Sequence, residues 1–243
     1  MGKQLHIRYA LAGVFLLAAA LFTACGGNRA AGSGSAEVLL HTTAGDIRLE
    51  LDGRTPRHRD NFLKLTREGF FDSVLFHRVI AGFMIQSGDP DSRRAPAGMP
   101  LGEGDAGYEL PAEIVYPALG HTRGALAAAR TSDDVNPGRK SSSSQFYIVW
   151  GRQMTDDALD RAQQRVTAAT NGRAVIPDSL RELYKSIGGT PHLDGQYTVF
   201  GHVTGGLEVV DAIQRVETDS LDRPLADVRI LHAEVVREPD AKK

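Results

Sequence analysis

A single arginine stands among bulky apolar residues in the segment 76–88, which reads FHRVIAGFMIQSG. At strand spacing, Arg78, Met84 and Gln86 fall at alternate positions, and a glycine-containing turn separates two short strands. A guanidinium beside Phe83 works where water is partly excluded, and its hydrogen bonds are worth more there than on an open surface. The segment therefore predicts a positioned hydrogen-bond donor next to apolar side chains.

The elements that must position this segment are mostly strands. A proline near its start and a glycine at its end predict a short amphipathic helix over 55–69, and helical spacing predicts a second over 208–216. Many strands with two short helices favour a mainly β fold, a closed antiparallel β-barrel capped by the two helices, although periodicity alone leaves barrel and open sandwich unresolved. Besides the two strands of 76–88, the expected strands are 38–42, 46–51, 124–129, 144–149, 197–203 and 227–236.

The stretch 152–189 differs from the rest because it is charged and rich in alanine. Leu159, Ala162 and Val166 recur at helical spacing, and a second helical run follows over 177–187. This pattern predicts a helical hairpin inserted between two barrel strands. Its role is either a solvated surface excursion or a contact surface for a partner or client, and the residues leave both readings open.

The first residues have the pattern of an export signal. Lys3 and Arg8 precede an apolar run over 9–24, and at 16 residues this run is shorter than the ~20 that a bilayer span needs. Small residues then lead up to Cys25. We expect 1–24 to be a signal peptide that takes no part in the fold.

Residues 21–25, LFTAC, resemble a bacterial lipoprotein cleavage box, which implies a lipid on Cys25. The alternatives for this single cysteine are part of an uncleaved anchor, or a reactive or buried thiol. The small residues over 25–36 predict a flexible tether, followed by the main domain over 37–238. The resemblance implies a location in the bacterial cell envelope, lipid-anchored to a membrane, with the domain outside the cytoplasm.

The composition also indicates which kinds of partner and ligand are not expected. At 243 residues, the chain suits one large domain or two small ones, and its formal net charge is -2. Basic patches interleaved with aromatic residues are missing from the sequence, so nucleic acid is not an expected partner. The spacing of the histidines matches no ligand pattern, so we expect no metal site.

Five separate blocks resemble the cyclophilins, a family of peptidyl-prolyl cis-trans isomerases. The segment 76–88 resembles the FHRxIxGFMxQGGD signature, 124–130 the G-x-x-x-M-A-[NR] strand, and 144–148 the SQFFI block. HLDGQYTVFG over 192–201 resembles WLDGxHxVFG, and 102–113 is a looser relative of the family's glycine loop and PDE segment. The resemblance runs from about residue 37 to 236, interrupted by 152–189.

The resemblance implies a role for each matching position. Arg78 takes the position of the catalytic arginine, with Phe83 and Gln86 counted beside it. Arg130 takes a position that binds the peptide mainly through its backbone, and His192 stands where the family has a tryptophan. The implied substrate-binding residues are Met84, Ala129, Arg130, Thr131, Tyr147, His192, Leu193 and Tyr197.

These residue types fit one reaction. Amide resonance imposes a barrier of about 18–20 kcal/mol on rotation of an Xaa-Pro bond. In the twisted transition state the prolyl nitrogen becomes an acceptor, so a guanidinium aimed at it stabilises that state more than either planar one. The resemblance thus implies an isomerase that acts on proline-containing polypeptides and needs no cofactor. The rival readings are a non-catalytic proline-peptide-binding chaperone and an envelope scaffold.

Overall fold

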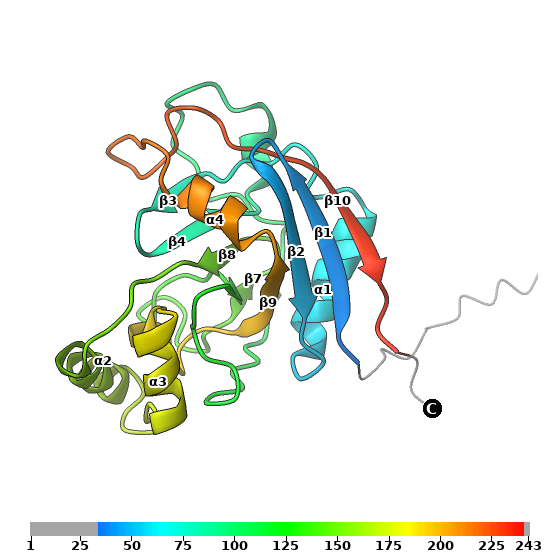
Figure 1. The fold of residues 1–243 in the computed structure, drawn as a ribbon. Helices are drawn as coiled ribbons and strands as arrows, with labels where there is room; N and C mark the ends of the chain where they lie inside the picture. The colour runs from blue at the N-terminus through cyan, green and yellow to red at the C-terminus, as the bar shows by residue number, and fades with distance from the viewer. Residues whose placement is uncertain (1–33, 241–243) are drawn as a thin grey trace, which may run out of the picture.

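The computed structural model describes residues 34–240, so the expected signal peptide and Cys25 lie outside the described residues. Figure 1 shows the arrangement of the elements. In chain order these are β1 (Ala36–Thr42), β2 (Gly45–Leu51), α1 (Pro56–Arg67), β3 (Arg78–Ile80), β4 (Met84–Ser87), η1 (Pro90–Arg94), β5 (Glu109–Leu110), β6 (Ala125–Ala128), β7 (Ser141–Ser142), β8 (Phe146–Val149), α2 (Asp156–Ala169), α3 (Asp178–Ser186), η2 (Pro191–Leu193), β9 (Val199–Gly205), α4 (Leu207–Gln214) and β10 (Ile230–Arg237).

One curled sheet organises the molecule. Its eight strands run in the order β10-β1-β2-β9-β6-β8-β4-β3, and every neighbouring pair is antiparallel. β1 and β2 form a tight hairpin in which Thr42 pairs with Gly45. The side chains of both strands alternate between buried and half-buried, which matches the two-residue period of the sequence.

The expected closed barrel is wrong. Among the described residues, β10 and β3 form the two edges of the sheet and share no ladder with each other. The edges approach only through the irregular segment before β3, where Leu75 makes an isolated bridge to Arg229 and Phe76 N–H donates to the Val228 carbonyl at 2.9 Å. Because this segment leaves the extended conformation before β3 begins, the ladder stops and the result is a half-barrel.

A carboxylate distant in sequence caps α1. Pro56 occupies the first turn, as predicted, and its missing N–H leaves nothing unpaired there. The Glu113 carboxylate accepts from the backbone N–H groups of Arg57 at 3.2 Å and His58 at 3.0 Å. An anion at this end also suits the helix dipole. The chain turns at Gly69, where φ is 65°.

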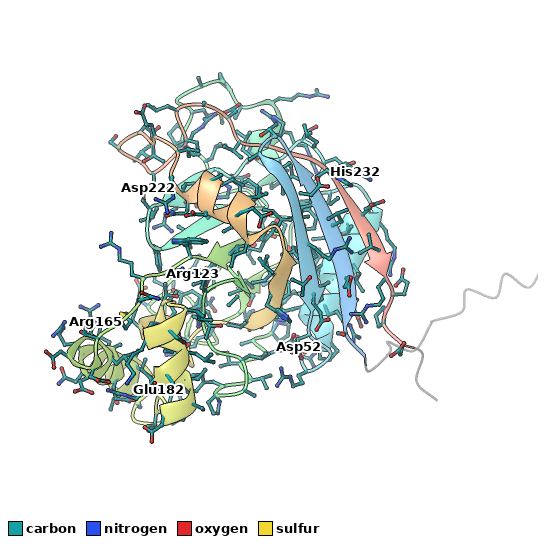
Figure 2. The ribbon with its side chains drawn as sticks, in the orientation of Figure 1. Asp52, Arg123, Arg165, Glu182, Asp222 and His232 are labelled. Atoms are coloured by element: carbon teal, nitrogen blue, oxygen red, sulfur yellow. The ribbon has the colours of Figure 1, made fainter. Side chains whose placement is uncertain are left out.

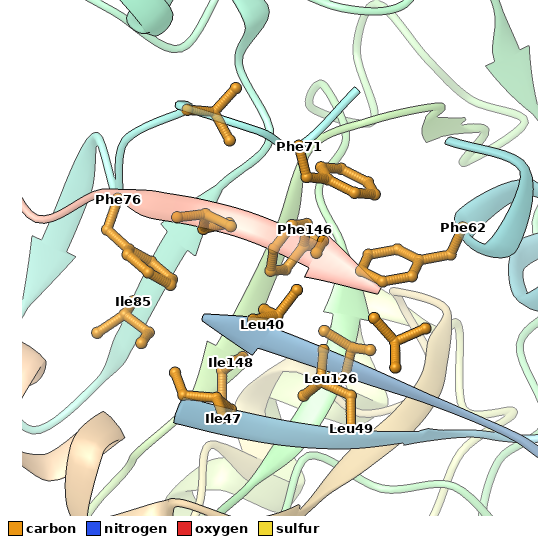
Figure 3. Close-up of a cluster of buried hydrophobic side chains, with 14 of the residues drawn as sticks. Leu40, Ile47, Leu49, Phe62, Phe71, Phe76, Ile85, Leu126, Phe146 and Ile148 are labelled. Atoms are coloured by element: carbon orange, nitrogen blue, oxygen red, sulfur yellow. The ribbon is translucent and has the colours of Figure 1, made fainter. Parts of the chain in front are cut away.

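The main core fills the concave side of the sheet under α1 (Figure 3). Leu40 and Leu49 from the first hairpin are fully buried in it. Phe62 of α1 stacks on Phe71 with ring centroids 4.6 Å apart and meets the edge of Phe146 at 5.3 Å. Burying apolar side chains contributes about 1.5–3 kcal/mol each, so this core fixes the sheet that carries Arg78.

Four α-helices are present in residues 34–240, namely the expected pair α1 and α4 and one helix in each of the two helical runs expected within 152–189. α1 and α4 lie against the sheet, whereas α2 and α3 lie together beside it (Figure 1). Along the chain, α2 and α3 come between β8 and β9. Leu159 and Val166 of α2 pack with Leu180 and Tyr184 of α3 in a second buried cluster. Arg165 on α2 and Glu182 on α3 are exposed on this pair (Figure 2).

None of the helices described over residues 34–240 is both long and apolar enough to cross a membrane.

Candidate active site

Strand register brings the predicted residues into one row. Arg78 of β3 pairs with Gln86 of β4, and Gln86 pairs with Tyr147 of β8. Met84 lies on the same face as Gln86, and Phe83 precedes it in the turn between β3 and β4. The alternation seen in the sequence therefore places the guanidinium and the apolar residues on one surface of the sheet.

Two further segments, 129–130 and 193–197, lie next to this row of strand residues. Ala129 and Arg130 follow β6, and Leu193 ends η2. Tyr197 lies just before β9. Together these segments and the strand row enclose a cavity of about 170 Å³. Its lining is Arg78, Phe83, Met84, Gln86, Ala129, Arg130, Tyr147, Leu193 and Tyr197.

Two residues expected in the site lie outside this lining. Thr131 is exposed to solvent. The His192 ring stacks on Phe83 with centroids 5.7 Å apart and an interplanar angle of 27°. Burial lowers the pKa of His192 from its ordinary value, so the ring is neutral at pH 7. His192 is half-buried and packs beside Phe83, next to the cavity lining.

Arg78 is held from two sides. Its Nη1 donates to Gln86 Oε1 at 3.4 Å, and its Nε lies 3.5 Å from the Asp222 carboxylate. Asp222 belongs to the loop between α4 and β10 (Figure 2). The Arg78 side chain is 44% exposed, so this pairing orients the guanidinium while leaving it accessible to a ligand.

The side chain of Gln145 orients the side chain of Gln86. Gln86 Nε2 donates to Gln145 Oε1 at 2.9 Å, and Gln145 Nε2 donates to the carbonyls of Gly102 and Gly104, each at 2.7 Å. These bonds fix the amide of Gln86 with its oxygen toward Arg78. Sequence analysis did not select Gln145, although it stands inside the block 144–148.

The Arg130 side chain turns into the protein and is 3% exposed. Its Nε donates to the Gln196 carbonyl at 3.0 Å, and its guanidinium carbon lies 4.3 Å from the centre of the Tyr197 ring. Such a cation–π contact stabilises the ring position. Arg130 thus orients Tyr197, which keeps an aromatic edge on the cavity.

The floor of the cavity continues into a buried tetrad of side chains, Tyr147, His121, Asp194 and Tyr184. The Tyr147 hydroxyl lies 3.0 Å from His121 Nε2, and His121 Nδ1 lies 2.9 Å from Asp194 Oδ1. The Tyr184 hydroxyl donates to Asp194 Oδ2 at 2.7 Å. Of these four residues only Tyr147 was expected in the site, because nothing in the local pattern near the other three indicates that they meet.

The cavity as a whole joins one cationic group to several apolar side chains. It combines Phe83, Met84 and Leu193 with the guanidinium of Arg78. Among residues 34–240, no group of three or more histidine, cysteine, aspartate and glutamate side chains could hold a metal ion. Fold and cavity define a class of mainly β proteins that hold an oriented cationic donor beside apolar side chains.

Comparison with known proteins identifies this class. A sequence model of the family described as "Cyclophilin type peptidyl-prolyl cis-trans isomerase/CLD" matches residues 37–235. The Arabidopsis thaliana protein "Peptidyl-prolyl cis-trans isomerase CYP18-1" is 31% identical over 83% of this chain and 97% of its own length. A Neurospora crassa protein, "Peptidyl-prolyl cis-trans isomerase-like 1", is 32% identical over 84% of this chain and 96% of its own.

A longer relative is also similar in sequence, and a solved structure shares the fold. Arabidopsis "Peptidyl-prolyl cis-trans isomerase CYP71" is 34% identical over 86% of this chain, which spans 26% of that protein. A Cryptosporidium parvum cyclophilin type isomerase, crystallised in the presence of the dipeptide ala-pro, has 24% identity and a TM-score of 0.56, covering 82% of this chain and 98% of its own. The chain belongs to the cyclophilin-type family and is an enzyme of the peptidyl-prolyl cis-trans isomerase class.

Proposed function

We propose that this protein accelerates Xaa-Pro isomerisation in exported proteins while they fold, with Arg78 as the catalytic donor. One observation carries the proposal: a half-exposed guanidinium, fixed by Gln86 and Asp222, borders an apolar cavity. Unaided, Xaa-Pro isomerisation takes tens of seconds or longer, which is slow enough to limit folding. A catalyst of this step therefore suits clients that reach the envelope unfolded.

The mechanism follows from differential binding. The pyrrolidine ring sits in the apolar part of the cavity, among Phe83, Met84 and Leu193, while the preceding carbonyl rotates. As resonance is lost, the prolyl nitrogen gains a lone pair, and Arg78 donates to it. Gln86 binds the peptide beside this point. Because the hydrogen bond from Arg78 to the prolyl nitrogen forms only in the twisted state, it lowers the barrier to isomerisation and does not simply tighten substrate binding. The ala-pro dipeptide used with the Cryptosporidium relative supports a proline-containing substrate.

The test follows isomerisation of a short Ala-Pro peptide by exchange NMR with the full chain in detergent. Arg78→Ala is expected to lower kcat/KM by two or more orders of magnitude, about 3 kcal/mol of transition-state stabilisation. Arg67→Ala is the matched control, because Arg67 lies at the end of α1, is 48% exposed and pairs with Glu238, and neither residue lines the cavity. This control should keep wild-type activity.

The same experiment separates the rival function. A proline-binding chaperone would bind the peptide without speeding exchange, and Arg78→Ala would leave binding and folding assistance intact. Wild-type protein that binds the peptide but gives no exchange would reject the enzyme proposal in favour of that binding module. Loss of activity in Arg67→Ala as large as in Arg78→Ala would also contradict it.

The proposal includes a lipid anchor on Cys25, which would hold the domain over 37–238 to a membrane of the bacterial envelope. The support is the LFTAC box after an apolar run. We expect labelled palmitate to enter the wild-type protein and not Cys25→Ser, and we expect that variant to leave the membrane fraction. Equal labelling of both proteins would refute the anchor.

We also assign residues 152–189 as an insertion into the family's fold. The support is that two family-like blocks, 144–148 and 192–201, flank this stretch directly. The stretch contains α2 and α3, which build a buried cluster of their own.

A further inference from the structure

The α2–α3 pair contacts the segment that carries one wall of the cavity. η2, which carries Leu193 of the cavity wall, packs against α2. The backbone N–H of Thr190, just before η2, donates to the His121 carbonyl at 2.8 Å. Tyr184 of α3 is fully buried, and a Cβ on Gly189 would lie 2.7 Å from its ring. The second buried cluster is therefore in direct contact with the segment around η2, which forms one wall of the cavity.

The tetrad provides a polar connection along the same path. His121 is 1% exposed and Asp194 is 0% exposed. Asp194 Oδ1 accepts from the backbone N–H of His121 at 2.9 Å in addition to facing its ring, and Oδ2 accepts from Tyr184. Both carboxylate oxygens are thus engaged, and the aspartate is fixed by groups from two different parts of the fold.

Hydrogen-bond direction can be followed from one end of the tetrad to the other. A carboxylate only accepts, so the proton between Asp194 and His121 belongs to Nδ1. In a neutral imidazole, Nε2 then accepts from the Tyr147 hydroxyl. Burial raises the pKa of both Tyr147 and Tyr184 above the ordinary value, so both hydroxyls are donors at neutral pH. Tyr184 thereby fixes the carboxylate that sets the tautomer of His121.

We propose that Tyr184 is a positioning residue: through Asp194 and His121 it orients Tyr147 in the floor of the proline cavity, so that the α2–α3 pair controls how well the cavity holds its substrate. The inference rests on the proposed isomerase function. Its physical basis is that a buried polar group without its partner moves to find another. If the Tyr184 hydroxyl is lost, Asp194 and then His121 rearrange, and Tyr147 is no longer held.

The test is Tyr184→Phe in the full chain, which removes one oxygen and keeps the ring. The cavity binds the proline ring in planar and twisted states alike, so the expected result is a KM raised about fivefold with kcat within about twofold. Arg78→Ala should lower kcat instead. Leu180→Ala is the matched control, because it trims α3 one turn earlier without removing a hydrogen bond. We expect it to lower Tm and keep the wild-type KM.

A spectroscopic readout reports the tetrad directly. Long-range ¹H–¹⁵N NMR should show His121 with its proton on Nδ1 in the wild type, and Tyr184→Phe should change both ring nitrogen shifts. Tyr147→Phe removes the hydrogen bond to His121 at the opposite end of the tetrad. Its effect on KM should therefore not add to that of Tyr184→Phe in the double variant.

The outcomes are distinct from those for the isomerase itself. If the wild type gives no exchange, the proposed function fails, and the Kd of the Ala-Pro peptide replaces KM in the same comparison. A wild-type KM and Kd in Tyr184→Phe would overturn the inference. So would an equal rise in Leu180→Ala, because general loosening of α3 would then explain the effect. Unchanged His121 shifts in Tyr184→Phe would overturn it as well.

Discussion

At the scale of single residues, we expect His192 to affect which large ligands bind next to the cavity. The resemblance places it where the family has a tryptophan, and its half-buried ring stacks on Phe83 next to the cavity lining. An imidazole in this position offers less aromatic surface than an indole and lacks the indole N–H. In the proposed mechanism the chemistry depends on Arg78 and the apolar side chains of the cavity, so we expect isomerisation not to need a tryptophan here.

We therefore expect weak binding of cyclosporin-type macrocycles. His192→Trp should tighten binding by about 1–3 kcal/mol, from added aromatic contact and one hydrogen bond. Isothermal titration calorimetry on wild type and variant measures this. His232→Trp, at a position 56% exposed on β10, serves as the control and should not change the affinity. Wild-type affinity equal to that of His192→Trp would contradict the prediction.

At the scale of elements, the β1–β2 hairpin depends on one glycine. Gly45 has φ of 125°, a region that other residues rarely adopt, and a Cβ there would lie 2.9 Å from a methyl carbon of Val209 on α4. The hairpin and α4 thus approach each other more closely than any side chain at position 45 permits.

Gly45→Ala should lower the free energy of unfolding by about 3 kcal/mol, from backbone strain and the contact with Val209. Gly98→Ala is the matched control: Gly98 also has positive φ, 75°, but a Cβ there would meet nothing within 4 Å. Gly98→Ala should lower the free energy of unfolding by only about 1 kcal/mol. Urea unfolding of both variants checks the difference, and equal losses would show that the α4 contact contributes nothing.

At the scale of the whole molecule, stability should depend on pH through His77. This side chain is 3% exposed, and burial lowers its pKa to about 4. Its unfolded pKa is about 6.5. Above pH 6.5 the ring is neutral in both states. As pH falls from 6.5 to 4, the unfolded chain takes up a proton that the folded protein excludes, so stability falls.

A shift of this size corresponds to about 3 kcal/mol between pH 7 and pH 4. His77→Gln should be less stable at pH 7 but should lose less of its remaining stability over the same range. Urea unfolding at several pH values measures both curves. If the two curves run parallel between pH 7 and pH 4, another group is responsible for the acid sensitivity.

Local sequence determined much of the fold and part of the cavity. Alternation predicted β1 and β2 within two residues of their observed ends, and helical spacing at Leu159 and Val166 predicted α2. Strand alternation also placed Arg78, Met84 and Gln86 on one face, because residues two apart on a strand must share a face. The other six predicted residues that line the cavity came from the family resemblance and not from periodicity.

Tertiary structure alone decided the remaining features. Whether the sheet closes depends on how Leu75 meets Arg229, 154 positions later by residue number. The tetrad joins His121 to Asp194, and the cap of α1 joins His58 to Glu113. No periodicity within one segment specifies which distant segment it will face. Partners for buried polar groups are therefore chosen by the packing of the whole molecule, where leaving any of them unpaired is costly.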